Sequence, residues 1–299
     1  MKKQIFVIII IALISLAFVG CSNNNEEVEA NTNNEENNAV KENVELLEEI
    51  PDYIVINEES YSTKDTELIL HGQFTNADIE QLKYMVNLQS LHIGWTNQIS
   101  DISPLARLTN LTELSLVNNQ INDISPLAGL TNLTTLSLQG NLINDISPLV
   151  GLTNLTILVL IENQISDISA LTGLTNLTLL NLKDNQINNI YGLEKLTSLE
   201  RLFLGNNQIG DINGLAGLIN LTTLELAGNQ VSDISVLAEL TNLTWLKLDA
   251  NQIRDVISLG GLPSLTVKWL SLLDTPLSAE QIAEIRAAFP NAEIHHADH

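Results

Sequence analysis

The sequence is poor in cysteine, in aromatic residues and in positive charge. Cys21 is the one cysteine among 299 residues, and 4% of the residues are aromatic. A single cysteine excludes a disulfide within the chain, so the ends of the fold must be held by packing alone. Lys and Arg number 13 against 36 Asp and Glu, which gives a formal net charge of -23. Nucleic acids and anionic lipid surfaces are therefore poor partners for this protein.

The sequence also lacks the motifs that carry chemistry. It contains no glycine-rich phosphate loop, no GxSxG turn around a nucleophilic serine and no cysteine and histidine cluster with metal-site spacing. The tail holds metal-binding residue types, but a polar chain end explains it better; these residues are His295, His296, Asp298 and His299. We therefore expect a non-catalytic protein without a cofactor or a metal.

The sequence is rich in copies of one 22-residue segment. The segment from Leu111 to Asn132, LTELSLVNNQINDISPLAGLTN, recurs almost to the end of the chain. The copies begin at Leu88, Leu111, Leu133, Leu155, Leu177, Leu199, Leu221 and Leu243. A degenerate copy precedes them, with Leu68, Leu70, Ile79, Leu82 and Met85, and another follows from Leu265. The pattern predicts about ten stacked coils, because a single coil buries too little surface to fold alone.

Each copy predicts the same local structure. Leu114 and Leu116 alternate with polar residues, which is typical of a short strand with one buried face. The asparagine after the strand has an amide that can donate to and accept from nearby backbone, so we expect a structural ladder; its members are Asn119, Asn141, Asn163, Asn185, Asn207, Asn229 and Asn251. Asp123, Ser125 and Pro126 suit the start of a short 3-10 turn.

The pattern LxxLxLxxNxIxDIxPLxxLxxL resembles the leucine-rich repeat, in the 22-residue class of the bacterial internalins, over roughly residues 65 to 290. The resemblance implies an α/β leucine-rich repeat solenoid. Its curved parallel β-sheet would form the concave face, and short 3-10 or extended segments would form the convex face. It also implies recognition or adhesion at the cell surface.

The two ends of the array differ from the repeats and are candidate caps. Residues Leu277 to Ile294 predict a helix with Ile282, Ile285 and Phe289 on one face, then Pro290 and a short last strand. Near the N-terminus we expect an amphipathic turn around Val40, Val44 and Leu47 and a strand from Tyr53 to Ile56. The predicted parts are a signal peptide (1–20), a tether (21–50), a cap with a degenerate coil (51–87), the repeats (88–264) and a last coil with its cap (265–299).

The N-terminus has the form of a lipoprotein signal. Lys2 and Lys3 precede an apolar run from Ile5 to Val19, which is short for a membrane span. Phe18, Val19, Gly20 and Cys21 resemble a bacterial lipobox, which implies cleavage before Cys21 and a lipid on its sulfur. An uncleaved anchor and plain secretion remain as alternatives. The Asn-rich and Glu-rich stretch after Cys21 predicts a disordered tether. With the lipid on Cys21, we expect the protein to be anchored to the membrane and to face outside the cytoplasm.

Two repeated polar columns have both a structural and a functional interpretation. One is the aspartate column Asp101, Asp123, Asp145, Asp167, Asp211, Asp233 and Asp255, which could attract cations but more simply starts the convex turns. The other begins Asn-Leu-Thr triplets that match the N-glycosylation acceptor, at Asn110, Asn132, Asn154, Asn176, Asn220 and Asn242. The repeat alone generates these triplets, so we do not expect glycosylation.

The positions that the repeat leaves free carry the functional hypothesis. In the coil from Leu155, Ile157, Val159 and Ile161 all point outward, and an exposed apolar cluster usually marks an interaction surface. Leu179 and Phe203 would continue it, Val117 and Leu142 would flank it, and Lys183, Asp184 and Arg201 would give it a polar rim. The alternative is that branched residues simply suit a strand.

A second cluster lies near the C-terminal end of the repeats. Trp245 and Trp269 occupy equivalent positions in adjacent coils, and Lys247 follows on the same face. Aromatic rings beside a cation could anchor a protein or stack against sugar rings. Shielding of the terminal coil by its cap explains the same residues equally well.

Together these features predict a lipid-anchored, monomeric binding protein whose concave face engages a protein partner. A binder of cell-wall polysaccharide is the main alternative, and it would use the tryptophans and the polar concave residues. A cytosolic enzyme regulator, similar to the leucine-rich repeat subunits that regulate phosphatases, is disfavoured by the signal peptide. A catalytic envelope protein is disfavoured by the missing motifs.

Overall fold

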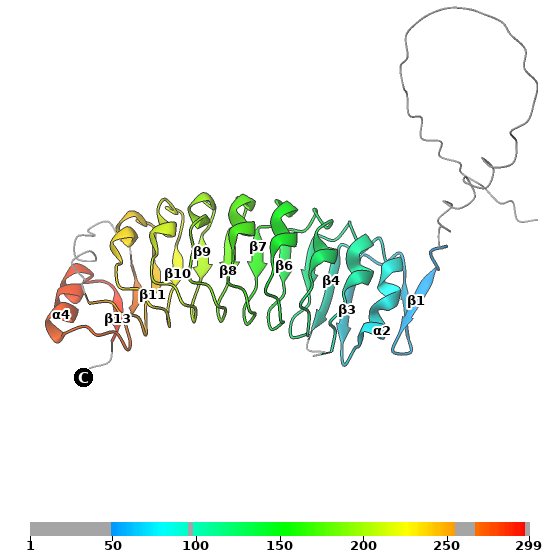
Figure 1. Ribbon diagram of the computed structural model, residues 1–299, viewed down its shortest axis with the longest axis horizontal. Coiled ribbons are helices and arrows are strands. Elements are labelled where there is room, and N and C mark those ends of the chain that lie inside the picture. Colours follow the sequence, from blue (N-terminus) through cyan, green and yellow to red (C-terminus); the bar gives the residue numbers. More distant parts are fainter. Residues whose placement is uncertain (1–48, 95–97, 255–266, 297–299) are drawn as a thin grey trace, which may run out of the picture. The chain divides into compact units, whose positions relative to one another are not determined.

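The computed structural model describes residues 49–94, 98–254 and 267–296. Residues 50–299 form one compact unit, which is the subject of all that follows. In Figure 1 the coils of this unit stand side by side in chain order, and those between residues 88 and 242 each carry one strand and one short 3-10 turn. The predicted signal peptide, the predicted tether and Cys21 lie outside the described residues.

The strands pair into one large parallel sheet in which every neighbour is the next strand along the chain. This sheet has 11 strands, in the order β13 to β3. They are β3 (Glu67–His71), β4 (Ser90–Gly94), β5 (Glu113–Ser115), β6 (Thr135–Ser137), β7 (Ile157–Val159), β8 (Leu179–Asn181), β9 (Arg201–Phe203), β10 (Thr223–Glu225), β11 (Trp245–Lys247), β12 (Trp269–Ser271) and β13 (Glu293–His295). Equivalent residues of successive copies are direct partners, such as Leu136, Leu158 and Leu180. The predicted leucine-rich repeat solenoid is confirmed.

Short 3-10 turns follow the strands, as the Asp, Ser and Pro pattern predicts. They are η1 (Glu80–Tyr84), η2 (Ser103–Arg107), η3 (Ser125–Leu127), η4 (Ser147–Gly151), η5 (Ser169–Gly173), η6 (Leu193–Lys195), η7 (Asn213–Leu215) and η8 (Ser235–Glu239). Pro lies in the first turn of η2, η3 and η4. The first coil departs from this form, since the four-residue helix α2 (Asn76–Ile79) precedes η1.

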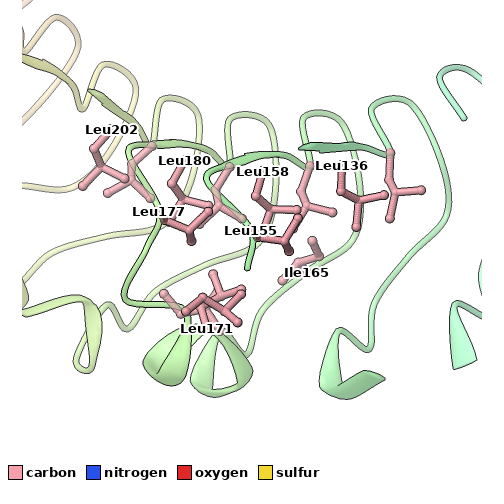
Figure 2. Packing of buried hydrophobic residues seen from close by; sticks show 14 of the residues in the cluster. Leu136, Leu155, Leu158, Ile165, Leu171, Leu177, Leu180 and Leu202 are labelled. Carbon is pink, nitrogen blue, oxygen red and sulfur yellow. The ribbon is translucent and has the colours of Figure 1, made fainter. Parts of the chain in front are cut away.

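The core is a stack of aliphatic layers, one from each coil. Figure 2 shows the strand leucines Leu136, Leu158, Leu180 and Leu202 in one row, with Leu171 of η5 on the opposite side of the core. All five are fully buried. Each coil therefore completes its core only by packing on the next, which is the property that makes a repeat array fold as a unit.

The asparagine ladder is confirmed and is buried. Asn163 Nδ2 donates to the Leu138 carbonyl of the preceding coil at 3.0 Å and to the Leu160 carbonyl of its own coil at 3.2 Å. Its Oδ1 accepts from the Ile143 backbone N–H at 3.0 Å. Its Nδ2 also lies 3.1 Å from the Ile161 carbonyl, so one amide pairs four backbone groups where the chain leaves the sheet, and the pattern repeats through Asn251. These asparagines hold the scaffold together.

The two ends are closed by different devices. At the N-terminal end, β1 (Tyr53–Ile56) pairs with β2 (Glu59–Ser62) in an antiparallel hairpin that buries Ile54 and Ile56. The sequence predicts β1 but not β2. At the C-terminal end, α4 (Ala279–Ala288) buries Ile282 and Ile285, and β13 adds the last strand of the sheet. The predicted helix and last strand are therefore confirmed, while the turn at Val40 to Leu47 lies outside the described residues.

Candidate binding face

The sheet face opposite the core presents two rows of side chains, because each short strand has an outward residue on either side of its central leucine. The first row runs through Glu113, Thr135, Ile157, Leu179, Arg201, Thr223, Trp245, Trp269 and Glu293. The second row runs through Ser115, Ser137, Val159, Asn181, Phe203, Glu225, Lys247, Ser271 and His295. Neighbours within a row are about 4.8 Å apart, so their side chains are in reach of one another.

The aliphatic patch consists of Ile157, Val159, Ile161 and Leu179. Ile157 and Leu179 are direct partners in the first row, and Val159 is in the second row of the same strand as Ile157. Ile161 follows just after β7, where the Gly140 N–H still donates to its carbonyl at 2.9 Å. All four side chains are half-buried on the outer face of the sheet. The structure therefore brings the four predicted aliphatic residues together.

The other apolar residues of the hypothesis lie at greater distance from this patch. Phe203 stands in the second row one strand beyond Leu179, in a diagonal relation to it. Val117 occupies the position of Ile161 two coils earlier, and Gln139 stands between them. Leu142 is 46% exposed, but it follows the ladder residue Asn141 in the turn after the strand.

An ion-pair network of Lys183, Glu225, Lys247 and Asp249 occupies the face between the patch and the tryptophans. Lys183 Nζ lies 3.2 Å from Glu225 Oε1, and Lys247 Nζ lies 3.9 Å from the same atom and 3.8 Å from Asp249 Oδ2. The Glu225 side chain is 9% exposed. Lys183 reaches Glu225 across the coil of Gly205, where an added Cβ would stand 3.1 Å from Glu225 Oε1. The ammonium groups of Lys183 and Lys247 are therefore paired with carboxylates of the same face.

The predicted polar rim is consequently reduced to Arg201. Asp184 accepts a hydrogen bond from Asn206 Nδ2 at 2.7 Å, and Lys183 is committed to the network. Arg201 is exposed in the first row, directly beside Leu179. The sequence analysis missed this network. The signal for it is Gly205, which lies in the coil between Lys183 and Glu225 and leaves room for a long side chain to pass.

The tryptophan stack consists of Trp245, Trp269 and His295. The two indoles lie face to face with ring centroids 4.6 Å apart and planes 3° apart. The His295 ring follows on the far side of Trp269 at 5.1 Å, with a tilt of 40°. His295 belongs to β13, and its Nε2 lies 2.8 Å from Glu293 Oε1. The sequence interpretation of His295 as part of a loose polar end is therefore wrong, since pairing of β13 with β12 places it on the sheet.

The aspartate column starts the convex turns, as the simpler interpretation predicts. Asp145 Oδ1 accepts from the Ser147 backbone N–H at 2.8 Å, and Asp233 does the same with Ser235 at 2.9 Å. In each case this backbone hydrogen bond, followed by one from the serine hydroxyl, lowers the pKa of the carboxyl group. Asp123 and Asp211 have lowered pKa values for the same first reason. Asp255 lies outside the described residues.

The Asn-Leu-Thr column has a structural role that the sequence analysis missed. Asn132 Nδ2 donates to the Thr109 carbonyl of the preceding coil at 2.8 Å, and Asn154 Nδ2 donates to the Thr131 carbonyl at 2.8 Å. The same bond is made by Asn110, Asn176, Asn220 and Asn242. These asparagines form a second ladder along the edge where the strands begin, with the nitrogen that a glycan would modify already engaged.

Within the three described ranges, no group of three or more His, Cys, Asp or Glu side chains is arranged to hold a metal ion. In the same part of the chain, no helix has both the length and the apolar character needed to cross a membrane.

Comparison with known proteins places the chain in a family. A family model described as leucine-rich repeats (2 copies) matches residues 109–151, 131–174, 175–217 and 197–239. Internalin C2 of Listeria monocytogenes is 40% identical over 62% of this chain and 83% of its own, with a TM-score of 0.58. The internalin InlF of the same organism is 30% identical over 81% of this chain and 86% of its own, with a TM-score of 0.54. The chain belongs to the internalin family of leucine-rich repeat proteins.

A solved leucine-rich repeat structure from outside Listeria matches as well. A leucine-rich repeat protein of Leptospira interrogans is 27% identical over 76% of this internalin-family chain and 59% of its own, with a TM-score of 0.70. A search of curated proteins gave no match. Within this chain the scaffold positions recur from copy to copy, whereas the patch, the network and the stack occupy positions that differ between copies of the repeat.

Proposed function

We propose that this internalin-family protein is a non-catalytic binding protein that captures a protein partner on the outer face of its sheet, at the aliphatic patch. The observation that carries the proposal is the register of β7 and β8. It sets Ile157 beside Leu179 and leaves Val159 and Ile161 next to them on the same face. Four aliphatic side chains gathered on one face, with polar residues at their borders, are the composition of an interface core.

The surroundings of the patch support a protein as the partner. Arg201 stands at its border, and arginine is enriched at protein interfaces because its guanidinium can donate several hydrogen bonds at once. Polar residues Thr135, Ser137 and Gln139 border it on the other side. The patch thus has an apolar centre with a polar edge.

The scaffold supports binding without a large loss of entropy. A buried asparagine ladder, a second and exposed asparagine ladder and a continuous aliphatic core fix the backbone under the patch. A preorganised surface loses little conformational freedom when a partner binds. Shape and apolar burial are then the whole mechanism, and no chemical step is involved.

The double substitution Ile157→Asp with Ile161→Asp tests this proposal. Charges at the centre of the patch would have to be buried without partners, so we expect capture of the partner after crosslinking on intact cells to be lost. Thr223→Asp with Ala227→Asp is the matched control, since it adds the same charges to equivalent positions three coils away. Unchanged capture by a folded double variant in the patch would refute the aliphatic-patch proposal.

We also propose that the chain is a lipoprotein, anchored to the membrane through Cys21 and facing out of the cytoplasm. The support is the sequence alone, namely Lys2 and Lys3, the apolar run to Val19 and the Gly20-Cys21 pair. Because the lipid is attached to the sulfur, Cys21→Ser should abolish incorporation of labelled fatty acid and release the protein from membranes. Ser22→Ala serves as the control. A Cys21→Ser protein that is still labelled and membrane-bound contradicts the proposal.

A further inference from the structure

The tryptophan stack runs across three strands and ends at Thr223. His295, Trp269 and Trp245 are contributed by β13, β12 and β11, and their rings follow one another along the sheet. The next first-row position, on β10, is Thr223, which pairs directly with Trp245. The stack therefore stops at β10, where the small side chain of Thr223 stands in the position that a ring occupies on β11 and β12.

The repeat spacing makes this place suitable for a ring. One strand interval separates Trp269 from Trp245, and it sets their centroids at 4.6 Å. The same interval separates Trp245 from Thr223. Since Trp269 covers one face of the Trp245 indole, the opposite face looks toward β10. A ring bound over Thr223 would therefore meet that face at ordinary stacking distance.

The opposite side of this place is bounded by Arg201. Arg201 pairs with Thr223 in the first row, so Arg201 and Trp245 are two strand intervals apart, or about 10 Å. This separation accommodates one ring layer between the indole and the guanidinium. Arg201 is exposed and can direct its N–H donors toward the bound ring.

Polar groups border the place along the edge where the strands begin. An open depression of about 760 Å³ is lined there by Thr178, Ser198, Glu200, Asn220, Thr222, Asn242 and Thr244. Asn220 and Asn242 are fixed by bonds from Nδ2 to the carbonyls of Thr197 and Ile219, at 2.9 and 2.8 Å. Thr222 and Thr244 donate their hydroxyls to the carbonyls of Glu200 and Thr222, both at 3.1 Å. Their side-chain oxygens are thereby held in place as acceptors.

We propose that the place over Thr223, between the Trp245 indole and Arg201, binds one neutral pyranose ring of a glycan, with the rest of the glycan along the depression. The apolar C–H face of the sugar stacks on the indole, and its hydroxyls donate to the fixed amide and threonine oxygens. Arg201 donates to ring or hydroxyl oxygens from the other side. This site shares only Arg201 with the border of the aliphatic patch, and it does not depend on the partner proposed for the patch.

The chemistry of the border favours a neutral sugar over other rings. The side chain of a protein partner, such as tyrosine, would fill the stack, but it would leave most acceptor oxygens of the polar lining without a donor from the ligand. A nucleotide or an acidic sugar would bring negative charge next to Glu200, on a chain of net charge -23. The neighbouring Glu225 is already paired with Lys183 and Lys247, so it offers no free charge for a cationic ligand.

The test titrates the purified full chain with chitohexaose and, separately, with cellohexaose, by calorimetry and by tryptophan fluorescence. We expect at least one of these oligosaccharides to bind at millimolar concentration and to change the fluorescence. Trp245→Leu removes the stacking face, and Thr223→Trp fills the place with a further ring. Each should weaken binding by about tenfold or more. Thr135→Trp, the same change in the same row of β6, should leave the affinity unchanged.

The other outcomes overturn the proposal. If neither oligosaccharide binds, or if Thr223→Trp and Trp245→Leu bind them as well as the unaltered chain, the site does not take a neutral sugar. If Thr223→Trp abolishes capture of the protein partner while no oligosaccharide binds, the occupant is a protein side chain. The Ile157→Asp with Ile161→Asp protein should keep its sugar affinity, so failure of the patch proposal and failure of this one are distinguishable.

Discussion

The aliphatic patch and the tryptophan stack lie on the same sheet but are fixed in different ways. The patch side chains rest on the sheet and on each other, with Ile157 beside Leu179 as the one direct pair in a row. The stack is held ring on ring, and His295 of the C-terminal cap closes it at one end. The patch side chains can therefore adjust on a fixed backbone, whereas the rings of the stack also hold one another in place.

The ion-pair network between the two regions explains why they remain distinct. Glu225 forms ion pairs with Lys183 from the patch side and with Lys247 from the stack side, so these charges are neutralised within the face. A large partner on the patch meets neutralised polar groups before it reaches the indoles. Coils that share one scaffold can thus present two distinct surfaces when a few long side chains cross between them.

The largest effect should come from the ladder that both regions share. Asn163→Ala under the patch and Asn251→Ala under the stack each leave several buried backbone groups unpaired, among them the N–H groups of Ile143 and Val231. We expect each to lower the free energy of unfolding by about 4 kcal/mol, measured by urea denaturation. The exposed neighbours give the controls, Gln164→Ala and Gln252→Ala, each expected within about 0.5 kcal/mol. A large difference between the two ladder variants would mean that the scaffold is not uniform.

The second effect concerns the network. Glu225→Ala leaves Lys183 and Lys247 on a partly buried surface without their shared carboxylate, so we expect a loss of about 3 kcal/mol in urea denaturation. Adding Lys183→Met should recover part of this loss, because the remaining lysine still has Asp249. Glu113→Ala removes a more exposed acid, paired with His92, and should cost no more than about 1 kcal/mol. An equal loss in the free energy of unfolding for Glu225→Ala and Glu113→Ala would show that the network is no stronger than an exposed ion pair.

The third effect separates rigid from adaptable packing. Trp269→Ala removes the ring between Trp245 and His295, and we expect it to lower the free energy of unfolding by about 2 kcal/mol. Ile157→Ala removes a half-buried side chain that rests mainly on the sheet, and we expect about 1 kcal/mol or less. Urea denaturation of both variants compares them directly. A larger loss for Ile157→Ala would reverse our assignment of rigidity.

The smallest effect is a common response to acid. The convex aspartates Asp123, Asp145, Asp211 and Asp233 have pKa values lowered by hydrogen bonds in the folded state. They stabilise the fold above the unfolded pKa of about 3.9, and this contribution is lost as the pH falls through the folded values. Acid titrations followed by tryptophan fluorescence and by a probe at position 159 should therefore give the same midpoint. Two separate midpoints would contradict a shared scaffold.

The scaffold follows from the sequence almost completely, because most of its residues recur from coil to coil. Leu114 and Leu116 define the strand period, Asn119 marks the strand end, and Asp123 with Pro126 marks the turn. The hairpin strand β2 could not be predicted in this way, since Glu59 to Ser62 has no alternation of apolar and polar residues.

The side-chain contacts of the outer face could be predicted only in part. The repeat register alone brings Ile157 beside Leu179 and Trp245 beside Trp269. The Lys183 and Glu225 pair joins residues two coils apart, and the lysine side chain passes Gly205 of the coil between them, so no pattern within a single coil reveals the pair. His295 joins the stack because β13 extends the sheet, so its role depends on the cap.

The central claim is that a protein partner is bound where the copies of the repeat differ. Photocrosslinking on intact cells tests this claim most directly. A photoreactive phenylalanine analogue is placed at Val159 in the patch, at Ser115 in the same row two coils earlier, and at Ser232 on the convex side. We predict one discrete crosslinked protein from position 159, little from position 115 and none from position 232. Crosslinks of equal strength from position 232, or none from position 159 in a folded and exported chain, would contradict the claim.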